Sequence, residues 1–201
     1  YAGERQRRRQ PRNEREVPVI AIVGYTNAGK STLLNRLTGA DVYVANELFA
    51  TLDPTSRRLR FPTVKDEVGR EVVLIDTVGF IRDLPDTLKN AFRATLEELA
   101  DADLLLHVVD GADARREQHI EAVDDVLDDL GLHDTPRLIV LNKMDRRKDD
   151  GAGEATRRRA VCVSALTGAG LPELVARLRE LLPSIPGHEH VHVGSPGATP
   201  A

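Results

Sequence analysis

The chain has 201 residues, of which 41% are hydrophobic and 30% are charged, and its formal net charge at pH 7 is −4. This length suits one domain of ordinary size with tails, and the nearly balanced charge gives no reason to expect whole-surface binding to nucleic acid. No apolar stretch approaches the roughly 18 residues of a membrane span, and the N-terminus lacks a signal-peptide pattern, so we expect a cytoplasmic protein without a membrane span.

The two ends of the chain differ from its middle. Residues 1–16 are polar and strongly basic, without apolar periodicity, and such a segment cannot bury a core. We interpret it as a linker, with contact to RNA phosphates as the alternative. Residues 184–201 are rich in Gly, Pro and His and predict a disordered tail. The domain itself is expected over residues 17–183.

A phosphate-binding loop opens this domain. The β-branched run 17–23 is too short and continuous for a surface helix and predicts a buried parallel strand. Residues 24–31 read GYTNAGKS, a complete G-x-x-x-x-G-K-[ST] motif, and a helix is expected from 31 to 38. In that context Lys30 would reach the β- and γ-phosphates of a nucleotide, and Ser31 would bind Mg²⁺. The expected nucleotide contacts here are Gly24, Tyr25, Thr26, Asn27, Ala28, Gly29, Lys30, Ser31 and Thr32.

Strands and helices alternate along the rest of the domain. The expected strands are 57–61, 71–76, 104–109, 137–141 and 160–163. The expected helices are 88–100, 115–130 and 171–182. The alternation predicts an α/β fold, a mostly parallel six-stranded sheet with helices on both faces. Cys162, the only cysteine, falls inside an apolar segment and is expected to be buried and inert.

A second motif, Asp76-Thr77-Val78-Gly79, stands at the tip of the expected strand 71–76, 46 positions after Lys30. An acid at the end of a strand beside the phosphate loop can hold the Mg²⁺ shell through water. The Gly79 amide can bond the γ-phosphate. This segment therefore predicts the metal and γ-phosphate side of the site.

A third motif, Asn142-Lys143-Met144-Asp145, indicates the base. The Asp145 carboxylate can accept hydrogen bonds from the ring N–H and the exocyclic amine of guanine, a donor pair that adenine lacks. The Lys143 stem can lie over the base, and Asn142 can tie its loop to the phosphate loop. Ser164 and Ala165, after the last strand, could bring a backbone N–H to the guanine oxygen. The motifs lie in order at strand ends, where open α/β sheets bind ligands, and predict GTP and GDP as ligands.

The segment 48–55, LFATLDPT, lies where a mobile loop could complete the Mg²⁺ shell while the γ-phosphate is present. Thr51 and Thr55 both qualify chemically.

These segments, with DTVGFIRDLP at 76–85 and FRATLEE at 92–98, resemble the GTPase domain of HflX-type proteins over about residues 17–182. The resemblance implies a P-loop NTPase with a Ras-like G domain, and it makes Thr51 the Mg²⁺ and switch residue, with Phe49 and Ala50 beside the nucleotide. It also implies a monomer that associates with the large ribosomal subunit and splits or rescues stalled ribosomes. HflX-type proteins carry a large N-terminal domain, of which residues 1–16 would be a basic remnant.

The hydrolytic group is not evident. Ras-like enzymes place a glutamine directly after the DxxG glycine, but here that position is Phe80, which cannot orient water, so slow intrinsic hydrolysis is expected. Asn27 is a candidate for holding K⁺ beside the phosphates, as in related potassium-activated GTPases, although capping the loop is the alternative role. Arg82, close to the DxxG motif, is a candidate for approaching the γ-phosphate, with a solvated switch residue as the alternative. Two rival functions are a nucleotide-gated ribosome or RNA binding module with negligible turnover, and a ribosome-assembly GTPase.

Overall fold

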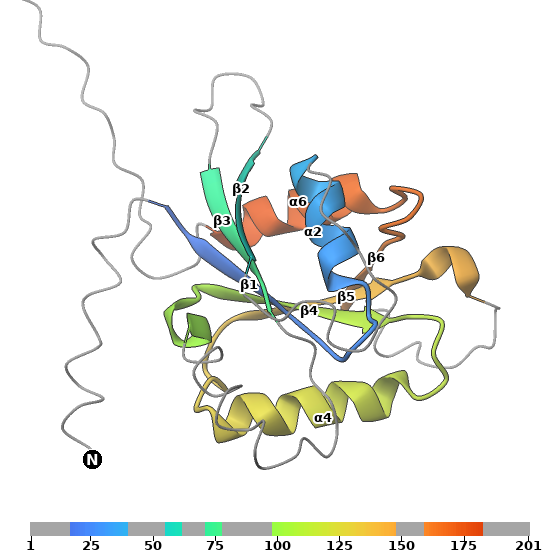
Figure 1. The fold of residues 1–201 in the computed structure, drawn as a ribbon, viewed down its shortest axis with the longest axis horizontal. Coiled ribbons are helices and arrows are strands. Elements are labelled where there is room, and N and C mark those ends of the chain that lie inside the picture. Colours follow the sequence, from blue (N-terminus) through green and yellow to red (C-terminus); the bar gives the residue numbers. More distant parts are fainter. Residues whose placement is uncertain (1–16, 40–54, 62–70, 78–97, 148–158, 183–201) are drawn as a thin grey trace, which may run out of the picture.

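The computed structural model describes residues 17–39, 55–61, 71–77, 98–147 and 159–182 (Figure 1). The strands are β1 (Val19–Val23), β2 (Thr55–Arg60), β3 (Glu71–Asp76), β4 (Leu104–Asp110), β5 (Arg137–Asn142) and β6 (Ala160–Cys162). The α-helices are α2 (Lys30–Thr38), α4 (Arg116–Asp129) and α6 (Leu171–Leu181), and two short 3₁₀ helices are η2 (Glu98–Asp101) and η3 (Met144–Arg146).

The strands form one six-stranded sheet in the order β2-β3-β1-β4-β5-β6. Every neighbouring pair from β3 to β6 is parallel, and only the edge strand β2 runs antiparallel, to β3. The predicted mostly parallel sheet is thereby confirmed. Because the parallel strands all end at the same edge, their last residues and the described residues that directly follow them gather there.

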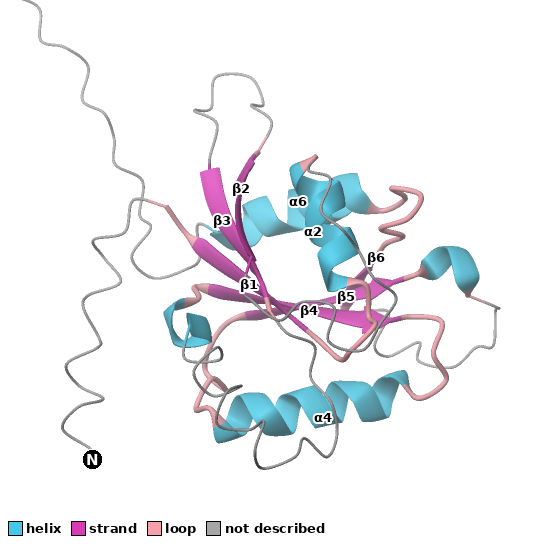
Figure 2. Ribbon diagram, in the orientation of Figure 1, coloured by secondary structure: helices cyan, strands magenta, loops and turns pink. Residues whose placement is uncertain are grey.

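Helices cover both faces of the sheet, as predicted (Figure 2). Ile20 and Ile22 of β1 belong to the larger core, with side chains of α2 and α6. Ala21 and Val23, which alternate with these residues along the strand, belong to the core on the opposite face of the sheet, with side chains of α4. Successive strand side chains point to opposite faces, so a strand covered on both faces must be apolar throughout, which explains the unbroken apolar run of β1.

The predicted element boundaries agree with the structure to within about two residues wherever it describes them. The expected helix 88–100 lies outside the described residues except for its end, where η2 forms. The expected tails, 1–16 and 184–201, also lie outside them. None of the helices in the described ranges combines the length and apolarity needed to cross a bilayer.

One expectation about burial is wrong. Cys162 is partly exposed rather than buried. It ends β6, the other edge strand of the sheet, and packs at the margin of a small cluster around Val109, Ile120 and Leu141. The apolar pattern of its segment reflects the neighbouring Val161 and Val163, which point into the larger core.

Candidate functional site

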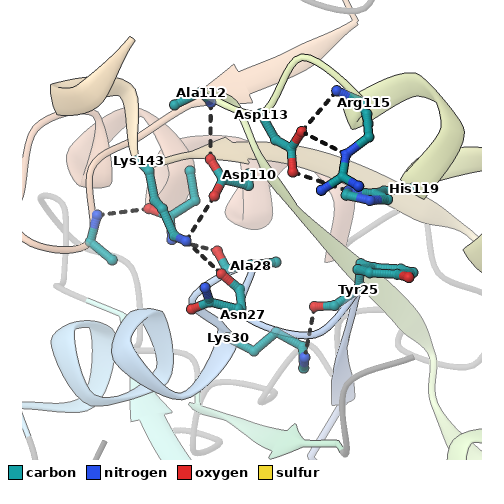
Figure 3. A network of polar contacts seen from close by, with 12 residues as sticks. Tyr25, Asn27, Ala28, Lys30, Asp110, Ala112, Asp113, Arg115, His119 and Lys143 are labelled. Carbon is teal, nitrogen blue, oxygen red and sulfur yellow. Dashed lines mark hydrogen bonds and ion pairs between the residues drawn. The ribbon is translucent and has the colours of Figure 1, made fainter. Parts of the chain in front are cut away.

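The candidate site lies at the edge of the sheet where the parallel strands end. The loop after β1 carries the phosphate-loop motif, and the loop after β5 carries the base motif. Asp76 ends β3, Asp110 ends β4, and Ser164 follows β6. Part of the resulting polar network is drawn in Figure 3.

Two glycines allow the phosphate loop to lie close to its neighbours. Gly24 has φ 151°, and a Cβ at this position would come within 2.1 Å of the Val108 carbonyl oxygen. Gly29 has φ 92°, and a Cβ there would lie 2.4 Å from Asn142 Nδ2. Only glycine fits both the backbone angle and the space. The motif glycines therefore serve the approach of this loop to β4 and to the base loop.

Lys30 begins α2 and is nearly buried, with 6% of its surface exposed. Its ammonium donates to the carbonyl oxygens of Gly24 at 3.2 Å and Tyr25 at 3.3 Å (Figure 3). Burial lowers the pKa of Lys30 to about 8, although the nearby Asp76 charge acts in the opposite direction. The loop's own carbonyls thus hold the ammonium inside the loop.

Ser31 and Asp76, the expected metal-binding residues of two motifs, lie in direct contact. The Ser31 hydroxyl donates to Asp76 Oδ2 at 2.5 Å, and Asp76 is 2% exposed. Thr77 Oγ1 donates to the Ile22 carbonyl at 2.7 Å, which fastens the end of β3 to β1. A hydroxyl and a carboxylate are the hard oxygen donors that Mg²⁺ prefers. The chemistry of this donor pair therefore fits the metal that the phosphate-loop motif implies.

Asn142 joins three loops. Its side chain, 2% exposed, donates through Nδ2 to the Ala28 carbonyl at 3.0 Å. It accepts through Oδ1 from the Ala165 N–H at 2.9 Å. The predicted link from Asn142 to the phosphate loop is present, and the link to the loop after β6 adds to it. The Ala165 N–H, which the sequence offered to the guanine oxygen, is engaged by Asn142 in this structure.

Lys143 and Asp145 follow in the base loop. Lys143 has φ 61°, and its ammonium donates to the Asn27 carbonyl at 2.5 Å and pairs with Asp110 Oδ2 at 2.7 Å (Figure 3). The exposed Asp145 accepts from Ser164 Oγ at 2.5 Å. Ser164 is 1% exposed and also accepts from the Thr167 N–H at 3.1 Å. A buried hydroxyl thereby sets the position of the carboxylate that would face the base.

Tyr25 differs from the other loop residues, because its ring stacks on His119 of α4 with centroids 4.0 Å apart and an interplanar angle of 6°. A cavity of about 220 Å³ lies beside this stack, between the loop and the end of β4. The Tyr25 ring is thus held against α4 at the side of this cavity.

Asp110 belongs to this polar network but was not among the residues predicted from the sequence. The signal was available, since Asp110 follows the apolar run 104–109 just as Asp76 follows its own strand. Six of the expected site residues lie outside the described residues: Phe49, Ala50, Thr51, Val78, Gly79 and Arg82. Thr55 lies in β2, where its backbone is in register with Asp76.

Residues 19–143 match the model of a family described as 50S ribosome-binding GTPase. The chain is 50% identical to "GTPase HflX" of Escherichia coli K12 over 183 residues, which cover 89% of this chain and 42% of that protein. It is 52% identical to "GTPase HflX" of Caldanaerobacter subterraneus over 174 residues, 86% of this chain and 39% of that protein. The chain thus spans about two fifths of the length of these relatives.

Among solved structures, the fold is similar to that of a GTP-binding protein from Sulfolobus solfataricus in complex with GDP. The TM-score is 0.61 and the identity 29%, and the match covers 82% of this chain and 52% of the other.

Proposed function

The chain belongs to the HflX family of ribosome-binding GTPases, and on that premise we propose that it binds Mg²⁺ with GTP, hydrolyses GTP to GDP and phosphate, and acts on the large ribosomal subunit. As part of a longer protein, it would serve the splitting or rescue of stalled ribosomes. The observation that carries the proposal is the Asn142 junction. One buried amide joins the phosphate loop to the base loop and to the loop after β6, so phosphate and base would be bound by one connected unit.

The same geometry supports the proposed nucleotide contacts, except that of Thr51, which lies outside the described residues. Lys30 and the loop amides would hold the phosphates, where a helix N-terminus and a buried ammonium favour negative charge. Asp145 would accept the guanine donors, and the Lys143 stem would cover the base. Ser31 would bind Mg²⁺ directly, Asp76 would hold it through water, and Thr51 would complete its shell. The ion would supply positive charge to the β- and γ-phosphate oxygens.

The GDP affinity is expected to fall as the pH rises above about 8, the pKa of Lys30 in the free protein. Phosphate oxygens favour the charged ammonium, so the complex keeps a proton that the free protein loses above this pH. Below pH 8 the group is charged in both states and contributes no pH dependence. Above it the affinity falls by up to about tenfold per pH unit, measurable by calorimetric titration at pH 7, 8 and 9.

The matched control is Lys30→Arg, whose guanidinium remains charged throughout this range. Its affinity is expected to be lower than that of the parent but level between pH 7 and 9. A decline equal to that of the parent would assign the pH dependence to another group.

Hydrolysis is expected to be faster in KCl than in NaCl by about tenfold or more at equal ionic strength, the scale on which preorganised charge acts on a transition state. Asn27 has φ 58° and an exposed side chain, and its carbonyl is engaged by Lys143. Asn27→Gly keeps this backbone angle accessible and removes the side-chain oxygen, so it should abolish the difference. Equal parent rates in both salts would contradict a K⁺ role and leave Asn27 as a loop residue only.

Single-turnover GTP hydrolysis with and without large ribosomal subunits tests the proposed function. Phe80 offers no group to orient water, so we expect slow hydrolysis alone and a large rise on the ribosome, where a partner group can add roughly 10³ to 10⁵ in rate. Subunit binding that depends on GTP without any rise in turnover would instead support a nucleotide-gated binding module. If the large subunit neither binds the domain nor raises its turnover, the assignment of the ribosome as partner of this domain is overturned.

A further inference from the structure

Asp110 lies at the end of β4, directly opposite Asn142 in the register of the parallel pair β4 and β5. Because the strands are in this register, the next residue of the base loop, Lys143, brings its ammonium to Asp110 Oδ2 at 2.7 Å. The pair is only slightly exposed, at 16% for the Lys143 side chain and 23% for Asp110. Such a charge-assisted contact is stronger than one in open solvent.

The Asp110 carboxylate is itself held in place. Its Oδ1 accepts from the Ala112 N–H at 3.0 Å, which closes a tight turn after the strand. The N–H of Gly111, between these two residues, donates to the Asn142 carbonyl at 2.7 Å. A Cβ on Gly111 would lie 2.8 Å from the Met144 sulfur and 3.0 Å from the Asn142 carbonyl. The turn after β4 is therefore pressed against the base loop on both sides of Lys143.

From these contacts we infer that Asp110 is a positioning residue for guanine-nucleotide binding, which holds Lys143 in the conformation that covers the base. The lysine ammonium has two partners, the Asn27 carbonyl in the phosphate loop and the Asp110 carboxylate. The carbonyl alone provides a partial charge, whereas the carboxylate provides a full one. Without Asp110 the ammonium turns to solvent, and the stem leaves the space over the base.

This inference rests on the proposed guanine-nucleotide binding, and it predicts a particular pattern of loss. Lys143 would contact the base plane and not its edge, so replacing Asp110 should weaken the binding of all guanine-like bases by the same factor. Asp145 would accept from the exocyclic amine, so replacing it should change the ratio of the affinities for bases with and without that amine. Inosine diphosphate lacks that amine, so comparing it with GDP separates the two roles.

The test measures dissociation constants of GDP, inosine diphosphate and ADP for the parent, Asp110→Asn, Asp110→Glu, Lys143→Met and the double variant Asp110→Asn with Lys143→Met. We expect Asp110→Asn to weaken the binding of GDP and of inosine diphosphate by the same factor, about tenfold. Asp110→Glu should recover much of that loss, since it keeps the charge. In the Lys143→Met background, Asp110→Asn should change the affinity less than about twofold.

Asp134→Asn, at a side chain that is 93% exposed, is the matched control and should bind as the parent does. A tenfold loss that persists in the Lys143→Met background, or an Asp110→Asn variant with parental affinity, would overturn the inference. A parent that binds ADP as tightly as GDP would instead refute the proposed guanine selectivity. Thermal unfolding of each ligand-free variant shows whether any loss of binding reflects loss of the fold.

Discussion

Asp145→Asn is expected to weaken GDP binding about 10³-fold and to transfer the preference to xanthosine diphosphate. A carboxylate offers two acceptors to the ring N–H and the exocyclic amine of guanine, whereas the asparagine amide opposes one of these donors with a donor of its own. Xanthine carries an oxygen where guanine carries the amine, so it accepts from that amide. A site built around such hydrogen bonds discriminates strongly because the mismatch leaves polar groups unpaired.

Competition binding of GDP and xanthosine diphosphate, with the parent and Asp145→Asn, measures this exchange. Asp145 is exposed, and the asparagine that replaces it can still accept from Ser164 Oγ through its side-chain oxygen, so the free energy of unfolding should hardly change. Asp125→Asn, an exposed acid of α4 remote from the base loop, is the control and should keep the parental preference. If the variant loses GDP without gaining xanthosine diphosphate, Asp145 does not read the base edge.

Asn142→Asp is expected to weaken GDP and GTP binding about 10²-fold. The substitution preserves the shape and keeps an acceptor for the Ala165 N–H, but it replaces the donor to the Ala28 carbonyl by a negatively charged oxygen. Two acceptors would then face each other in a buried site, which costs more than the loss of one hydrogen bond. The phosphate loop should separate from the base loop, and both ends of the nucleotide should lose their common support.

Calorimetric titration of both nucleotides gives the affinity, and urea unfolding of the ligand-free protein gives the stability. Asn142→Ala removes both contacts without adding charge and should bind better than Asn142→Asp. The reverse order would mean that the link to Ala165 matters more than the link to Ala28. Parental affinity in both variants would contradict the junction as the basis of the site.

Many features of this protein were predictable from local pattern. The β-branched run of β1 and the GYTNAGKS loop after it indicate a strand, a phosphate loop and a helix, because each depends on neighbouring residues. The approach of Ser31 to Asp76 was also predictable, since both motifs lie at the ends of parallel strands and such ends meet at one edge of a sheet. The two oxygens indeed lie 2.5 Å apart.

Other features required the packed structure. The apolar segment around Cys162 gave no sign that this residue ends an edge strand, so its partial exposure was missed. Tyr25 stands in the phosphate motif, yet its ring stacks on His119, 94 positions further along the chain. Nothing local to either residue encodes such a contact, because it depends on how α4 lies over the sheet.

The fold class, the order of the motifs and the family follow from the amino-acid sequence alone, because apolar periodicity and the spacing within a motif are local properties of the chain. The contacts of Asn142 with two neighbouring loops and of Asp110 with Lys143 become evident only in the folded protein. They depend on the register of the strands. Val109 pairs with Leu141, and Asp110 with Asn142, across β4 and β5, and a shift of one residue would turn the Asp110 side chain to the other face of the sheet.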